Sequence, residues 1–232
     1  MITTAISKIA KASAWQTIVL RAGIVGINFG VMVGLAAYLG LASFGALAVV
    51  WGFSLIASNA ISMGGPLLLL SRSNDGTGLT SRAVVFHTII GPAGIAFMAF
   101  PLLELLLPSQ PWLGILAGGF AINLITCMAS MMRALGSVQI SMALRDAGPQ
   151  IALGVAAVTT IGAQIYTTLL YAALGLGLFV IIAGAWCLSH KKWPQIVRHS
   201  GATPNIDSAL WGTGVLGMAL AQVDIVVGGS IL

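Results

Sequence analysis

The chain has 232 residues, of which 58% are hydrophobic and 6% are charged, and its formal net charge is +5. Soluble globular domains contain about 25% charged residues, so this composition excludes them and predicts an all-α, polytopic bundle of membrane helices in contact with lipid. Basic residues on one membrane face account for the net charge, and no nucleic-acid partner is expected.

Seven membrane spans are predicted. A helix that crosses about 30 Å of hydrocarbon needs about 20 apolar residues, so Gly, Pro and polar positions set the limits of each span. The predicted spans are residues 15–38, 45–70, 83–106, 112–133, 146–162, 165–188 and 208–231. Residues 1–14 are expected to form a cytoplasmic or interfacial segment, and residues 189–207 a cytoplasmic linker.

Basic residues are confined to one face of this topology. The turns on the other face, near 41–44, 108–112 and 162–164, contain none. Positive charge resists translocation, so the asymmetry predicts a cytoplasmic N-terminus. The ten basic residues are Lys8, Lys11, Arg21, Arg72, Arg82, Arg133, Arg145, Lys191, Lys192 and Arg198.

The first span carries two different faces. Four glycines repeat at spacings of three and four, which predicts a packing surface for another helix. Arg21 and Asn28 share the nearly opposite face, which is expected to line a cavity. The alternative for Arg21 is a long side chain that reaches the membrane interface. The glycines are Gly23, Gly26, Gly30 and Gly34.

Polar seams follow the second and fourth spans. Unsatisfied polar groups facing lipid are costly, so both seams are expected to face protein or water. Interhelical hydrogen bonding is the alternative to substrate contact. The second span has Ser54, Ser58 and Ser62 with Asn59 beside them, and the fourth has Gly119, Asn123, Thr126, Ser130 and Arg133.

The seventh predicted span contains Asp224, the acidic residue deepest within a span. A carboxylate at this depth is expected to be neutral, paired with a cation or in contact with water in a cavity. A functional role is the first hypothesis. A salt bridge between two helix bundles is the structural alternative.

Motifs for enzyme chemistry are lacking. The sequence has no nucleotide-binding loop, no paired catalytic carboxylates and no His and Cys cluster with metal-ligand spacing. Cys127 and Cys187 are expected in opposite halves of the membrane, which argues against a disulfide. We therefore expect a protein that is not an enzyme and that holds no metal or other cofactor.

Four short motifs resemble polysaccharide flippases of the multidrug/oligosaccharidyl-lipid/polysaccharide exporter superfamily. They are Tyr38-Leu39-Gly40-Leu41-Ala42-Ser43-Phe44-Gly45 between the first two spans, Gly64-Gly65 with Arg72 at the inner end of the second, Arg133-Ala134-Leu135-Gly136 after the fourth, and Gln222-Val223-Asp224 to Gly228 in the seventh. Each motif is short, and their order along the chain carries the resemblance.

The resemblance implies translocation of a polyprenyl-phosphate-linked glycan from the inner to the outer leaflet of the cytoplasmic membrane. It implies two six-helix lobes that rock around a central cavity, without covalent chemistry. Arg21, with Arg133 or Arg145, would supply positive charge for the phosphate, and Asn28, Asn59 and Asn123 would hydrogen-bond sugar hydroxyls. A polysaccharide polymerase or glycosyltransferases would be partners.

The chain differs from that family in its number of spans, because members usually have twelve or more. Residues 15–188 would be one six-helix lobe, and residues 208–232 the incomplete first helix of a second. We therefore expect either a fragment or a truncated gene product, and in the latter case another chain would complete the cavity.

Two other functions remain open. A multidrug exporter of the same superfamily would share the fold, but the first six spans lack the deeply embedded carboxylate that exporters of cationic drugs usually carry. A non-transporting membrane subunit of a polysaccharide assembly complex is the second alternative, and it predicts that Arg21, Asn28 and Asp224 tolerate alanine.

Overall fold

A computed structural model describes residues 2–74, 79–108, 110–160, 164–191, 193 and 197–198, together with the single positions 212, 216 and 220. The predicted linker lies largely outside these residues, and the predicted seventh span lies outside them apart from those three positions. The elements in chain order are α1 (Ile2–Leu39), α2 (Leu41–Ile61), α3 (Gly65–Asn74), β1 (Leu79–Thr80), α4 (Ser81–Val85), the π-helical turn η1 (Phe86–Ile90), α5 (Gly91–Leu106), α6 (Trp112–Ala134), α7 (Val138–Asp146), α8 (Gly148–Thr159), α9 (Ile165–Ser189) and β2 (Val197–Arg198).

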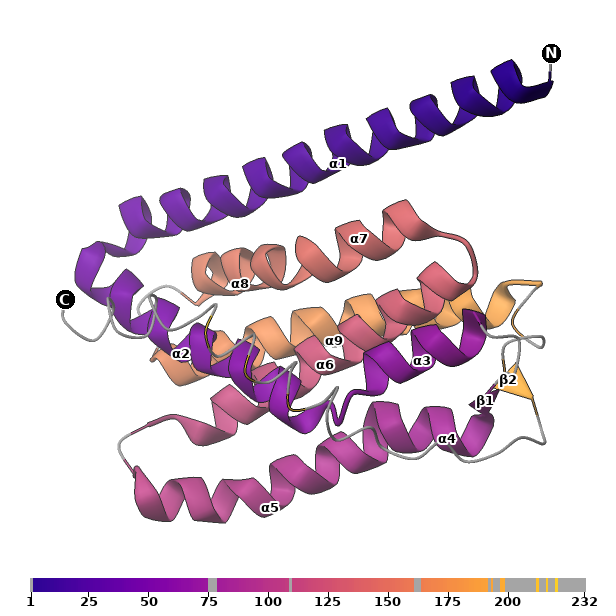
Figure 1. Cartoon of the computed structure of the whole chain (residues 1–232). Helices are drawn as coiled ribbons and strands as arrows, with labels where there is room; N and C mark the ends of the chain where they lie inside the picture. The colour runs from indigo at the N-terminus through magenta and orange to yellow at the C-terminus, as the bar shows by residue number, and fades with distance from the viewer. Residues whose placement is uncertain are drawn as a thin grey trace.

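The described part of the chain is a helical bundle built around α6 (Figure 1). α6 contacts α2, α3, α5, α7 and α9, whereas α1 lies on one side of the bundle and contacts α2, α7 and α8. Burial reflects these positions, because 67% of the most apolar part of α6 is buried against 11% of that of α1. The largest core cluster joins α2, α6, α8 and α9, with Leu35 as the contribution of α1.

Five of the described helical segments are long and apolar enough to cross a membrane. The chain is therefore a multi-pass membrane protein, and the prediction of an all-α membrane bundle is confirmed at this level. The five segments are Trp15–Leu39, Leu41–Ile61, Ser81–Leu106, Trp112–Ala134 and Ile165–Ser189.

The prediction of one continuous span over residues 45–70 is wrong, because the helix ends at Ile61 and a second helix begins at Gly65. Met63 and Gly64 adopt left-handed backbone conformations, with φ of 49° and 71°. Such angles cannot continue a right-handed helix. Pro66, which has no backbone N–H, follows in the first turn of α3, where an N–H would have no helical partner.

The prediction of a span over residues 146–162 is also wrong. α8 ends at Thr159 and has 12 residues, so it is about 18 Å long and too short to cross the hydrocarbon layer alone. α7 precedes it in nearly the same direction, and the two helices meet at Ala147 (Figure 1). Pro149 is the second residue of α8, and its missing N–H favours a helix boundary at this point.

The third span combines α4, η1 and α5. Pro92 cannot donate the α-helical hydrogen bond to the carbonyl group of Thr88, four residues earlier. Asn123 Nδ2 of α6 donates to that carbonyl at 3.4 Å instead. The junction between η1 and α5 thus gives the buried Asn123 a partner in η1.

The segments that contain basic residues gather at one end of the bundle (Figure 1). The start of α1, the end of α3, the start of α4 and the end of α9 lie there, and β1 pairs with β2 in parallel. The α1–α2 connection lies at the opposite end. We name the two ends the basic end and the neutral end.

Candidate functional site

A pocket of about 240 Å³ opens at the basic end, where α2 ends, α3 begins and α6 ends. We name it the arginine pocket, because it brings together two arginines from different helices. Its lining residues are Asn59, Ser62, Gly64, Pro66, Leu67, Leu70, Thr126, Ser130, Arg133 and Arg145.

The break after α2 shapes one wall of the arginine pocket. Asn59 Nδ2 donates to the Leu55 carbonyl oxygen at 3.1 Å, and Ser62 Oγ donates to the Asn59 carbonyl oxygen at 2.8 Å. These bonds tie both side chains to their own helix. The Asn59 side-chain oxygen has no partner within the described residues, so it remains an acceptor on the pocket wall.

The last two turns of α6 form the opposite wall. Thr126 Oγ1 donates to the Ile122 carbonyl oxygen at 2.8 Å, which ties this hydroxyl to its own helix. Arg133 is half-buried, and its Nε is fully buried without a hydrogen-bond partner within the described residues. A buried guanidinium N–H without a partner is costly, so an acceptor that reached this group would stabilise it.

Arg145 is bound differently from Arg133. Its Nε and Nη2 donate to the two carboxylate oxygens of Asp146 at 2.6 and 3.2 Å. The side chains of this pair are 41% and 34% exposed. Counting Arg133, Arg145 and Asp146, the pocket and its edge carry one net positive charge, and Arg133 contributes the positive charge that no carboxylate among the described residues balances.

Asn28 fixes α1 against the joint between α7 and α8. Its Nδ2 donates to the Asp146 carbonyl oxygen at 3.0 Å, while its Oδ1 is buried without a partner among the described residues. Asn28 therefore lies beside the Arg145–Asp146 pair rather than in the arginine pocket itself. Arg21 is exposed on α1 and is not among the residues that line this pocket.

The predicted packing role of the glycine stripe is wrong within the described part of the chain. A Cβ atom added at Gly23, Gly26, Gly30 or Gly34 would meet no atom within 4 Å. α1 packs instead through its other face, because Ile24 and Leu35 are buried and Gly154 of α8 approaches Val31 closely.

The polar seam of the fourth span does face protein or a pocket, as predicted. A Cβ added at Gly119 would lie 3.0 Å from Ala57 Cβ of α2, and Asn123 is 1% exposed. Farther along the helix, Thr126, Ser130 and Arg133 reach the arginine pocket. Asn123 itself lies deeper, where its Oδ1 accepts from Cys127 Sγ at 3.8 Å.

The cysteine prediction is wrong in one respect. Cys127 and Cys187 belong to the same hydrophobic cluster of α3, α6 and α9, so they do not lie in opposite halves of the bundle. Both are buried free thiols. Within the described residues, no group of three His, Cys, Asp or Glu side chains is placed to hold a metal ion.

The structure brings Asn59 and Arg133 into one pocket, places Asn123 deeper on α6 and Asn28 on the adjacent helix α1, and leaves Arg21 exposed on α1. Asp224 lies outside the described residues. Sequence reasoning placed Arg133 in the polar seam of the fourth span, but it treated Arg145 only as a basic residue with a charge role implied by resemblance. It gave no reason to expect both arginines in one pocket.

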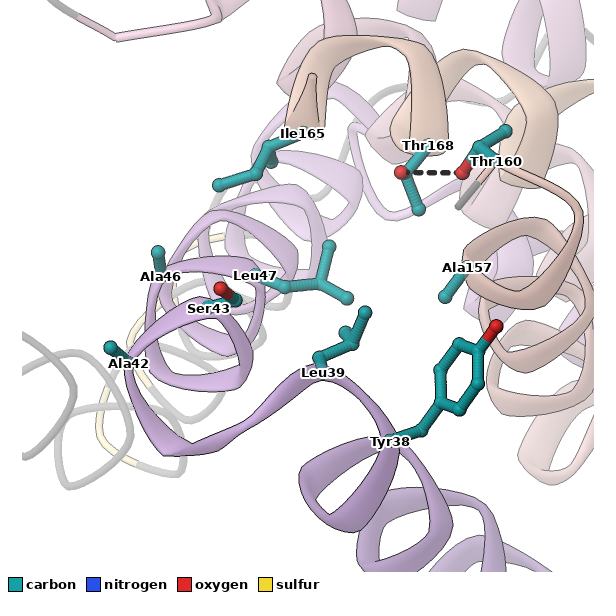
Figure 2. A pocket seen from close by; sticks show the side chains of 10 residues that line it. All are labelled: Tyr38, Leu39, Ala42, Ser43, Ala46, Leu47, Ala157, Thr160, Ile165 and Thr168. Carbon is teal, nitrogen blue, oxygen red and sulfur yellow. Dashed lines mark hydrogen bonds between the residues drawn. The ribbon is translucent and has the colours of Figure 1, made fainter. Parts of the chain in front are cut away.

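A second pocket, of about 760 Å³, was missed by the sequence analysis and opens at the neutral end (Figure 2). We name it the neutral pocket, because no charged side chain among the described residues lines it. Tyr38 appeared in the sequence only as part of a turn motif, and Thr160 and Thr168 gave no signal. The lining residues are Tyr38, Leu39, Ala42, Ser43, Ala46, Leu47, Ala157, Thr160, Ile165 and Thr168.

Comparisons of the chain with protein families, with curated proteins and with solved structures find no match.

Proposed function

We propose that this chain is a lobe of a flippase in the cytoplasmic, or inner, membrane that moves a polyprenyl-phosphate-linked glycan from the inner to the outer leaflet. The arginine pocket would receive the phosphate of the carrier. The multi-pass helical bundle and the order of the flippase-like motifs are consistent with this function. A polysaccharide polymerase or glycosyltransferases would supply or receive the glycan.

The observation that carries the proposal is the position of Arg133 in the arginine pocket, with a side-chain N–H that lacks a hydrogen-bond partner within the described residues. Its guanidinium group lies in a pocket lined by amide and hydroxyl groups, and its Nε has no partner within the described residues. Guanidinium groups bind phosphate through paired, charge-assisted hydrogen bonds, which are about twice as strong as neutral ones. Asn59 and Ser130 are placed on the same pocket to bind further oxygens or hydroxyls.

A multidrug exporter for cationic compounds is the weaker candidate. Such a transporter needs a negative group near its ligand, and the acidic residue in the five described spans is Glu104, close to the end of α5. Asp146, at the edge of the arginine pocket, is already paired with Arg145. Anion binding therefore fits the described charges better than cation binding.

The proposal is tested by placing the purified chain in lipid nanodiscs and measuring its affinity for a short polyprenyl diphosphate that carries one fluorescent sugar. Arg133→Gln removes the charge and should weaken binding about tenfold or more, because a charge-assisted hydrogen bond is lost. Arg133→Lys should restore part of the affinity. Arg82→Gln is the matched control, since Arg82 is exposed at the same end and does not line the pocket.

A second measurement separates transport from binding. The chain is reconstituted in vesicles, and the fraction of fluorescent lipid that becomes accessible to a membrane-impermeant quencher is followed with time. Transport that Arg133→Gln abolishes supports the flippase. Binding without transport favours a non-transporting subunit of a polysaccharide assembly complex. Equal affinity of the parent chain and Arg133→Gln for the diphosphate contradicts the proposal.

A further inference from the structure

We propose that the neutral pocket is a second binding site, which takes an uncharged sugar ring. It lies between the α1–α2 connection and the facing ends of α8 and α9 (Figure 2). Its volume of about 760 Å³ lies within the range of about 300–1,000 Å³ that is common for small-molecule pockets. The inference rests on the proposed function only for the source of the sugar, which would be the glycan of the carrier.

The lining selects against charged ligands. Apart from Tyr38, Ser43, Thr160 and Thr168, the side chains that line the pocket are apolar. An ion that entered would lose its hydration without gaining an opposite charge, which is strongly unfavourable. A ligand with hydroxyl groups on an otherwise apolar ring matches this combination of surfaces.

The two threonines are held in a defined hydrogen-bond order. Thr160 Oγ1 donates its single proton to the Ala156 carbonyl oxygen at 2.8 Å. The hydroxyl groups of Thr160 and Thr168 are 2.7 Å apart, so Thr168 must donate the proton in that bond. The remaining lone pairs of Thr168 Oγ1 are then free to accept a hydrogen bond from a ligand.

Tyr38 and Ser43 supply hydroxyl groups that can donate a hydrogen bond to a ligand, whereas Thr168 can accept one. Neither hydroxyl has a hydrogen-bond partner within the described residues, so both can donate. Tyr38 is 50% exposed, and Figure 2 shows its hydroxyl pointing toward the side of the pocket where Ala157 and Thr160 lie. The ring adds a flat apolar surface of the kind that packs against the C–H face of a sugar.

Helix ends add backbone groups to both sides of the pocket. α2 and α9 begin here, and α1 and α8 end here. The residue before α2 is Gly40, with a φ of 78° and no side chain to cap the helix. The first turns of helices present free N–H groups, and the last turns present free carbonyl groups. Sugar hydroxyls both donate and accept, so they match this mixture.

The site is tested with a photoreactive octyl glucoside that carries a diazirine on the sugar, applied to the intact chain in lipid nanodiscs. Mass spectrometry locates and quantifies the labelled peptides. We expect labels near Tyr38 and Thr168, which excess octyl glucoside suppresses and excess octanol does not. Thr168→Val keeps the side-chain volume and should weaken labelling about fivefold, as expected for one hydrogen bond.

Thr159→Val is the matched control, because the Thr159 hydroxyl is bonded to the Val155 and Ala156 carbonyl groups and does not line the neutral pocket. Its labelling should equal that of the parent chain. Ala46→Trp fills the pocket from an exposed position and removes no hydrogen bond. It should abolish the labelling even if a threonine variant fails to fold.

Equal suppression by octanol, or labelling that Thr168→Val and Ala46→Trp leave unchanged, would overturn the sugar site. Arg133→Gln separates this outcome from the proposed function. It should weaken binding of the diphosphate and leave glucoside labelling unchanged. If only the diphosphate result fails, the sugar site remains and the flippase proposal is lost. If only the glucoside result fails, the flippase proposal remains and the sugar site is lost.

Discussion

At the basic end of the bundle, α2 and the residue that caps it contribute Asn59 and Ser62 to a pocket that contains two arginines. At the neutral end, the same helix contributes Ala42, Ser43 and Ala46 to a pocket that no charged side chain in the described part of the chain lines. The predicted orientation would account for the difference, because positive charge resists translocation and stays on the side where the chain is made. Sites at the neutral end must therefore rely on hydroxyl groups, aromatic rings and helix ends.

The largest expected effect concerns the orientation of these two ends. Single cysteines at Leu41 and Val138, which are exposed near the neutral and basic ends, would be introduced into a Cys127→Ala, Cys187→Ala background. A membrane-impermeant maleimide should label only Leu41→Cys from outside intact cells and only Val138→Cys in inverted vesicles. The positive-inside bias requires this all-or-none result.

The background without introduced cysteines is the control, and it should remain unlabelled in both preparations. Labelling of both positions from one side would show that they do not lie at opposite membrane faces. A reversed pattern would place the N-terminus outside and contradict the predicted orientation.

Within the basic end, the two arginines should differ in their effect on diphosphate binding. Arg133→Glu reverses a charge that no carboxylate balances among the described residues, and affinity should fall more than tenfold. Arg145→Gln removes a charge already paired with Asp146, so a loss of about two- to threefold is expected. Affinity is measured by titration in nanodiscs. Equal losses for both variants would show that the Arg145–Asp146 pair opens to bind the ligand.

The two pockets share one rigid support, the close contact between α2 and α6. A Cβ at Gly119 would lie 3.0 Å from both Ala57 Cβ and the Ser54 carbonyl oxygen. Gly119→Val should therefore destabilise the bundle by about 1–3 kcal/mol and weaken ligand binding at both ends. Thermal unfolding in detergent measures the first effect, and the two ligand assays measure the second.

Gly26→Val is the matched control for this variant. A Cβ at Gly26 meets nothing within 4 Å, so stability and both affinities should equal those of the parent chain. If Gly119→Val weakened binding at one end only, the two pockets would not depend on a common support.

Long apolar segments and the gathering of basic residues at one end were predictable from sequence, because the first follows from burial in lipid and the second from the resistance of positive charge to translocation. Helix breaks were harder to predict from the sequence. Gly64, Gly65 and Pro66 do signal the end of α2, but the apolar residues on either side hide the break in a hydropathy pattern. The end of α8 at Thr159 had no comparable signal.

The candidate sites were less predictable than the helices. Spacing along one helix correctly grouped Thr126, Ser130 and Arg133, since residues three and four apart share a face. It could not show that Arg145 joins them, because that depends on how α7 packs against α6. The glycine stripe of α1 was assigned the wrong role for the same reason, since periodicity identifies a face but not its neighbour.

The smallest expected effect concerns the helix starts at the two ends. At the basic end, Thr80 Oγ1 accepts from the Ala83 N–H at 3.1 Å and caps α4, whereas Gly40 leaves α2 without a side-chain cap at the neutral end. Thr80→Ala should lower the free energy of unfolding by about 1 kcal/mol. That corresponds to a fall of about 2–4 °C in Tm.

Ser81→Ala is the control and should leave Tm unchanged, because the exposed Ser81 side chain makes no hydrogen bond among the described residues. Equal shifts for both variants would mean that the Thr80 cap contributes nothing, and that the basic end has no advantage over the neutral end in the stability of its helix starts.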